Sequence, residues 1–116
     1  MEEKRKYPRL KASFVVSYKL FDESKIMDVS QTKNISLGGM LLTTNREFEP
    51  GTKLSLTIRL PFQARPLSFI GKVISSEQVV KDMIYDTRIE LLSSSEEDKQ
   101  LFKDTLDIYF KRGEKR

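Results

Sequence analysis

Two groups of side chains in this sequence have the types and spacing needed to bind an organic phosphate. The first is Arg5 and Arg9, the ends of an R-x-x-x-R pattern. A guanidinium group binds an anion such as phosphate through paired N–H donors. Because Pro8 disfavours helical backbone at the residue before it, we expect an extended or turned arm whose two arginines approach a ligand from different directions.

The second group is Asn34, Ser36 and Gly39, in an N-x-S-x-x-G pattern. Asn34 offers an amide oxygen as acceptor and an NH₂ group as donor, and the Ser36 hydroxyl can donate or accept. Gly39 permits close backbone approach or positive φ where a side chain would collide with the ligand. Asn, Ser and Gly also favour tight turns for purely local reasons, so an ordinary β-turn is the alternative interpretation.

The amino-acid inventory argues against most catalytic and metal sites. The 116 residues include no His and no Cys, which removes the commonest general base, the commonest metal ligand and every thiolate nucleophile. We therefore expect a binding protein without catalytic residues, bound metal or cofactor. The chain has no long apolar run and no signal-peptide pattern, which predicts a cytoplasmic protein that does not insert into membranes.

The positive charge of the chain lies at its two ends. The net charge is +4, yet residues 1–11 carry +3, residues 111–116 carry +3, and the other 99 residues sum to −2. A nucleic-acid-binding domain is expected to spread positive charge over one face. The mildly acidic body therefore disfavours DNA or RNA as a partner, and the basic N-terminal end indicates an arm that meets a smaller anion.

Strands must position most of these side chains. Apolar residues recur at every second position in several segments, each bounded by polar or Gly- and Pro-containing turns. The expected strands cover residues 12–21, 26–33, 40–44, 53–60, 67–75 and 83–92. Residues 34–39, which hold the second motif, are expected to break the pattern between two of them.

The final segment changes to a helical period. Apolar residues at spacings of three and four predict a helix over 96–111, followed by a basic tail. Its start has the form of a capping box, either Ser94 with Glu97 or Ser95 with Asp98. Six strands with short turns and one amphipathic helix indicate a small, mainly β antiparallel barrel or sandwich with the helix packed on or beside it.

The two motifs, in this order and on strands that end in a helix, resemble those of the PilZ domain, the bacterial receptor module for cyclic di-GMP. The resemblance extends through P-G-x-x-L-x-L-x-I-x-L-P at 50–61 and a late strand Y-x-x-x-I-x-L. It implies a six-stranded antiparallel β-barrel with a C-terminal α-helix. The organisation expected is a flexible basic arm over 1–11, the barrel over 12–93, and the helix and basic tail over 94–116.

The resemblance also implies the ligand and the residues that bind it. Cyclic di-GMP presents two phosphates and two guanines, and the implied contacts are Arg5, Arg9, Asn34, Ser36 and Gly39. Lys4 and Gly38 are secondary contacts, and a basic residue at the position of Lys4 favours a stacked pair of ligands. At one position the chain departs from many family members, which have Gly where Arg88 stands. We expect that position to be structural, so the departure concerns local strand geometry more than ligand binding.

The expected function is a cyclic di-GMP receptor whose N-terminal arm changes conformation on binding. Its changed surface would signal to a downstream protein partner in motility, adhesion or biofilm control, as is typical of the family. Two alternatives stay open at this point. One is a protein-interaction adaptor of the same fold that does not bind the nucleotide. The other is a small β-barrel that binds single-stranded nucleic acid through aromatic platforms and a basic groove.

Overall fold

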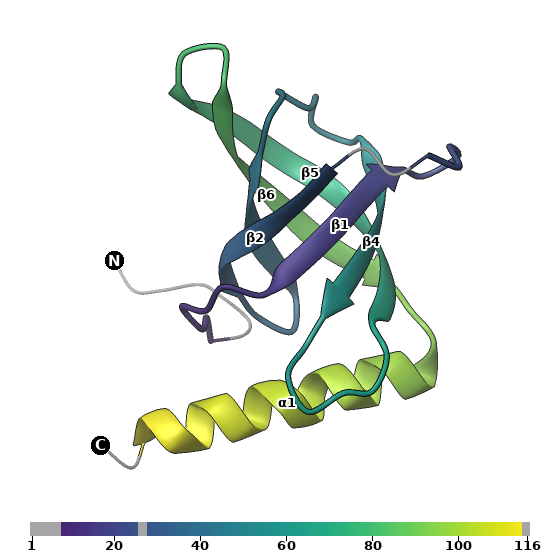
Figure 1. Ribbon diagram of the computed structural model, residues 1–116, viewed down its shortest axis with the longest axis vertical. Coiled ribbons are helices and arrows are strands. Elements are labelled where there is room, and N and C mark those ends of the chain that lie inside the picture. Colours follow the sequence, from purple (N-terminus) through teal and green to yellow (C-terminus); the bar gives the residue numbers. More distant parts are fainter. Residues whose placement is uncertain (1–7, 26–27, 115–116) are drawn as a thin grey trace.

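Residues 8–25 and 28–114, the part of the chain that the computed structural model describes, form a barrel of strands with one helix across its end (Figure 1). The elements are β1 (Val15–Leu20), β2 (Asp28–Ile35), β3 (Gly39–Thr44), β4 (Lys53–Arg59), β5 (Leu67–Val80), β6 (Ile84–Ser93) and α1 (Glu96–Glu114). The strands pair antiparallel in the order β1-β2-β3-β6-β5-β4, and β4 returns to pair with β1. This closure confirms the expected barrel and excludes the sandwich.

Alternation along the strands builds the barrel interior. Val16 and Tyr18 of β1 lie opposite Ile58 and Leu56 of β4, and all four side chains are almost fully buried. Similar inward rows come from the other strands, so one apolar core runs through the barrel. The period-two pattern predicted this arrangement because successive strand side chains point to opposite faces.

Helix α1 covers one end of the barrel (Figure 1). Phe102 and Leu106 are buried against the core, and the Phe102 ring meets Phe69 of β5 edge-on with centroids 5.0 Å apart. The helix runs to Glu114, three residues beyond the predicted end. Within residues 8–25 and 28–114, no helix combines the length and the apolarity that crossing a bilayer requires.

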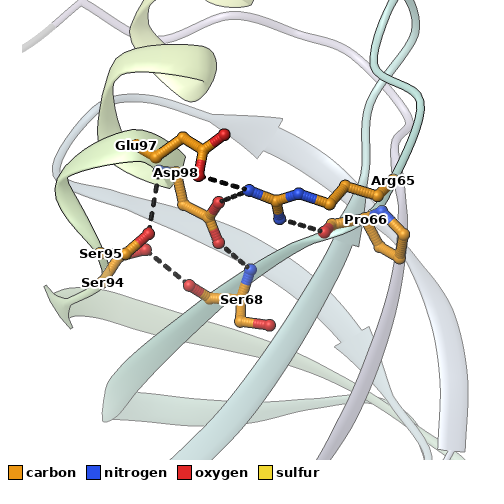
Figure 2. Close-up of polar contacts among 7 residues, drawn as sticks. All are labelled: Arg65, Pro66, Ser68, Ser94, Ser95, Glu97 and Asp98. Atoms are coloured by element: carbon orange, nitrogen blue, oxygen red, sulfur yellow. Dashed lines mark hydrogen bonds and ion pairs between the residues drawn. The ribbon is translucent and has the colours of Figure 1, made fainter.

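Polar contacts join the start of α1 to the barrel (Figure 2). One carboxylate oxygen of Asp98 accepts from the Arg65 guanidinium at 2.7 Å, and the other accepts from the Ser68 N–H at 2.9 Å. The Ser94 hydroxyl donates to the Ser68 carbonyl at 2.6 Å, and the Asp98 N–H donates to Ser95 Oγ at 3.0 Å. Ser95 is therefore the N-cap, as in the second expected pair, but the capping box is not completed because the Asp98 carboxylate accepts from Arg65 and Ser68 instead.

The environment of Asp98 favours its charged form although the residue is buried. Burial by itself raises the pKa of this carboxyl group, but the Ser68 N–H and the Arg65 guanidinium both stabilise the carboxylate. The hydrogen bonds and the opposite charge outweigh desolvation, so the pKa of Asp98 lies below its ordinary value. The negative charge also lies in the first helical turn, where it complements the helix dipole.

Several strand boundaries differ from prediction. β1 begins at Val15, because the Phe14 N–H is bonded to the Thr32 side chain at 3.0 Å. β2 runs to Ile35, two residues past its predicted end, because its last two residues pair with β3. β5 continues past residue 75 to Val80, because its polar second half pairs with β6 in a hairpin that projects beyond the barrel (Figure 1).

Candidate functional site

The second motif forms the end of β2, a tight turn and the start of β3. Asn34 pairs with Leu41 of β3, so it is a strand residue, and the expected break at that position is wrong. The turn follows: the Ser36 N–H donates to the Gly39 carbonyl at 2.8 Å, and the Gly38 N–H donates to Ser36 Oγ at 3.2 Å. The polar groups of the turn thus satisfy one another. The Asn34 amide side chain has no hydrogen bond to any described residue and stays available on the outer face.

Gly39 is required by the neighbouring strand. A Cβ atom added there would lie 2.4 Å from the carbonyl oxygen of Ile89 in β6, far inside contact distance. Among the glycines of the described segments, positive φ occurs at Gly51 and not at Gly39. Of the two expected roles of Gly39, positive φ does not occur and close backbone approach does, here to the backbone of Ile89.

A short bridge places Arg9 beside this turn. Leu10, in the arm expected over 1–11, exchanges both backbone hydrogen bonds with Ile35 at the end of β2, at 2.8 and 2.9 Å. Two residues later the chain is held again, because Thr32 Oγ1 donates to the Ala12 carbonyl at 2.6 Å. These contacts tie the backbone on the C-terminal side of Arg9 to the strand that carries Asn34.

The residues of both motifs meet at one hollow of about 440 Å³ on the outer face of the barrel. This volume is within the roughly 300–1,000 Å³ range of small-molecule sites. The predicted residues that line it are Arg9, Asn34, Ser36, Gly38 and Gly39. The other two predicted contacts, Lys4 and Arg5, lie outside the described residues. Two segments separated by more than twenty residues are thus brought to one surface.

Sequence reasoning missed the opposite wall of the hollow, which includes Ile74 of β5 with Arg88 and Glu90 of β6. Here Val73 pairs with Ile89 but Ser75 pairs with Arg88, so Ile74 is the extra residue of a β-bulge. The irregularity beside Arg88 therefore lies in β5 and not in β6 itself.

The sequence predicts a structural role for Arg88, whereas its side chain borders the hollow. The usable signal was the alternation in β6. Tyr85, Thr87 and Ile89 are buried, so Arg88 must face outward. Which outward-facing residues lie beside β2 depends on the strand order, and the sequence pattern does not contain that information.

The charges around the hollow favour an anionic ligand with hydrogen-bonding edges. Arg9 and Arg88 supply two cations, and Glu90 supplies one carboxylate whose Oε1 lies 3.8 Å from the Lys72 ammonium. Nearby, Lys33 Nζ lies 2.7 Å from Asp86, so that carboxylate is also compensated. Guanidinium groups bind phosphates, and the amide and hydroxyl groups can pair with a base. No cluster of three or more metal-ligating acids is present among the described residues.

A second hollow, of about 230 Å³, lies between α1 and the barrel. Its lining is mostly apolar and includes Leu37, Phe69 and Phe102. Leu37 comes from the turn of the second motif, so this turn presents its polar side to the first hollow and one apolar side chain to the second. None of the predicted ligand contacts lines the second hollow.

Comparison with known proteins places the chain among sequences of one family. The PilZ domain family matches residues 3–107, which is most of the chain. No curated protein matches the sequence.

Several solved structures share the fold. The Bacillus subtilis inhibitor of motility, MotI/DgrA, has a TM-score of 0.77 at 23% identity, over 99% of this chain and 54% of that one. The PilZ domain of Escherichia coli YcgR with c-di-GMP has a TM-score of 0.67 at 21% identity, over 97% of both chains. The K. pneumonia MrkH–c-di-GMP complex has a TM-score of 0.64 at 14% identity, over 99% of this chain and 57% of that one. The chain thus spans about half of the first and third proteins.

Proposed function

This chain belongs to the PilZ domain family, and on that basis we propose that it is a non-enzymatic receptor for cyclic di-GMP. The observation that carries the proposal is the shared hollow, where Arg9 of the first motif meets Asn34 and Ser36 of the second. Two of the structurally similar proteins are described as complexes with this nucleotide. We place the receptor in the cytoplasm.

Each motif residue has a chemical task in this proposal. Arg5 and Arg9 bind the two phosphates through paired N–H donors, which neutralises the ligand's two negative charges. Asn34 accepts from the N1–H and N2–H₂ edge of a guanine, and the Ser36 hydroxyl adds a polar contact beside it. Gly38 and Gly39 keep the floor of the hollow free of side chains. Lys4 adds charge for a second, stacked nucleotide.

The proposed output is a change in the N-terminal arm. The cations of residues 1–11 repel one another without a ligand, and the phosphates remove that repulsion. The arm then closes over the nucleotide against the barrel, from the anchor that Leu10 makes with Ile35. The new surface formed by arm and ligand is recognised by a downstream protein, and motility is one output that the name of the B. subtilis relative supports.

Isothermal titration with cyclic di-GMP tests the binding proposal. We expect micromolar or tighter affinity that is lost in both Arg5→Ala and Arg9→Ala. Arg59→Ala, which removes an exposed arginine of β4 that does not line the hollow, is the matched control and is expected to bind normally. The absence of heat at high ligand concentration with the unaltered chain would refute the proposal and favour the adaptor.

The arm movement has its own test, because the arm contains five trypsin sites: Lys4, Arg5, Lys6, Arg9 and Lys11. If the nucleotide closes the arm, its addition should slow tryptic cleavage within residues 1–11. Cleavage after Lys111 and Arg112, which are exposed near the other end of the chain, provides the internal control. Equal cleavage rates with and without saturating nucleotide would contradict closure while leaving binding intact.

A further inference from the structure

Arg88 of β6 differs from four nearby charged residues of β2, β5 and β6 that form two ion pairs. Lys33 is paired with Asp86, and Lys72 lies near Glu90. The Arg88 guanidinium has no hydrogen bond or ion pair with any residue in the described part of the chain. The side chain is nevertheless partly buried and borders the hollow that holds the motif residues. A partly buried cation without a protein partner is suited to an anionic or electron-rich ligand.

The strand register relates Arg88 directly to Asn34. Asn34 of β2 pairs with Leu41 of β3, and Leu41 pairs with Arg88 of β6, so the three form one cross-strand row. Two strand spacings separate the outer members, which places their Cα atoms about 10 Å apart. The Asn34 amide and the Arg88 guanidinium therefore lie on either side of Leu41, and both border the hollow.

That space fits a flat, partly apolar group. Gly39 lies beside the row and contributes no side chain, while Ile74, raised by the β-bulge, adds an apolar wall that is 42% exposed. A purine offers an acceptor pair, O6 and N7, on one edge when it is guanine, and donors, N1–H and N2–H₂, on the next edge. Asn34 can serve the donor edge, and Arg88 can serve the acceptor edge.

We propose that Arg88 is a specificity-determining residue that donates to O6 and N7 of one guanine while Asn34 accepts from the other edge of the same base. This inference rests on the proposed function and deepens it, because it assigns base recognition to a residue outside both motifs. The arginine fork is complementary to guanine, and adenine lacks the O6 acceptor. Arg88 thus contributes to the choice of guanine, whereas Arg5 and Arg9 bind phosphate.

Titration of three chains with two nucleotides tests this inference. The chains are the unaltered protein, Arg88→Ala and the control Arg59→Ala, and the nucleotides are cyclic di-GMP and its analogue with 7-deazaguanine bases, which lacks N7. Arg88→Ala should weaken cyclic di-GMP binding about 5- to 150-fold, the range for a bidentate contact to a base. The analogue should bind the unaltered chain and Arg59→Ala more weakly than cyclic di-GMP. In Arg88→Ala the two nucleotides should bind within about twofold of each other, because the contact is already absent.

Arg88→Lys keeps the positive charge and the aliphatic part of the side chain but not the paired N–H donors. Its affinity for cyclic di-GMP should therefore be almost as low as that of Arg88→Ala. This variant also keeps the test valid if Arg88→Ala fails to fold, as judged by circular dichroism. Two results would overturn base recognition by Arg88. One is an Arg88→Lys affinity for cyclic di-GMP equal to that of the unaltered chain. The other is an analogue that binds more weakly than cyclic di-GMP by the same factor in Arg88→Ala and in the unaltered chain. Failure of the unaltered chain to bind cyclic di-GMP would instead overturn the proposed function, and this inference with it.

Discussion

Leu10 and Ile35 exchange a pair of backbone hydrogen bonds, and this isolated bridge links the start of the described chain to the strand that leads into the N-x-S-x-x-G turn. It is the contact that brings Arg9 to the hollow. Because Leu10 follows Arg9 and Ile35 ends β2, the bridge mechanically connects the position of Arg9 with that of the turn.

Leu10→Pro should weaken cyclic di-GMP binding while the barrel stays folded. Proline removes the N–H that bonds to the Ile35 carbonyl, and the loss of one hydrogen bond is worth about 1 kcal/mol, or roughly fivefold in affinity. Calorimetric titration measures the effect. Leu10→Ala keeps the N–H and is the matched control, so equal losses in both variants would show that apolar packing, and not the bridge, holds Arg9.

Asn34→Asp should keep or improve the affinity for cyclic di-GMP. The substitution preserves the acceptor oxygen at nearly the same place and gives it a negative charge, and hydrogen bonds to charged groups are stronger than neutral ones. Asn34→Leu, of similar volume without an acceptor, should bind poorly. Titration of both variants decides the role, and a large loss in Asn34→Asp would contradict base recognition by residue 34.

Gly39→Ala should destabilise the barrel by about 1–3 kcal/mol, the usual effect of forcing extra atoms into a packed region. The new methyl group would meet the Ile89 carbonyl oxygen, which belongs to backbone and cannot rotate away. Urea unfolding measures the change. Thr43→Ala alters the same β3–β6 ladder without adding atoms and should have a smaller effect. An unchanged unfolding midpoint in Gly39→Ala would show that the two strands can separate at little cost.

Asp98→Asn should lower the unfolding free energy by about 1–3 kcal/mol at pH 7, because charged hydrogen bonds to Arg65 and Ser68 are weakened. The pKa of Asp98 is depressed in the folded state, so its contribution is complete well above 3.8, its ordinary value. That contribution is lost as the pH falls below this value and through the folded-state pKa. The difference between the two proteins should therefore narrow at acid pH.

Urea unfolding at pH 7 and pH 3 measures this effect. Asp104→Asn makes the same charge change at an exposed position of α1 and should alter stability little. A difference between Asp98→Asn and the unaltered chain that stays constant from pH 7 to pH 3 would show that the ionised carboxylate does not stabilise the start of the helix.

Much of the fold was predictable from local patterns. Alternating apolar residues in β1, β4 and β6 identified three strands and their inward faces, and the change of period identified α1. The second half of β5 was missed, because its residues are polar or exposed and are held as a strand by pairing with β6. Periodicity reports burial, so it cannot detect a strand whose stability comes from cross-strand hydrogen bonding.

The sequence by itself determined the residue types that can bind a phosphate and a base, the spacing of the two motifs, and the inward faces of the strands. Only the tertiary structure decided that Gly39 avoids the Ile89 backbone, that Leu10 anchors Arg9 at the hollow, and that Arg88 faces Asn34 across β3. The physical reason is that side-chain chemistry and period are local properties of the chain. Which strand lies beside which, and in what register, is set by barrel closure, a property of the whole fold.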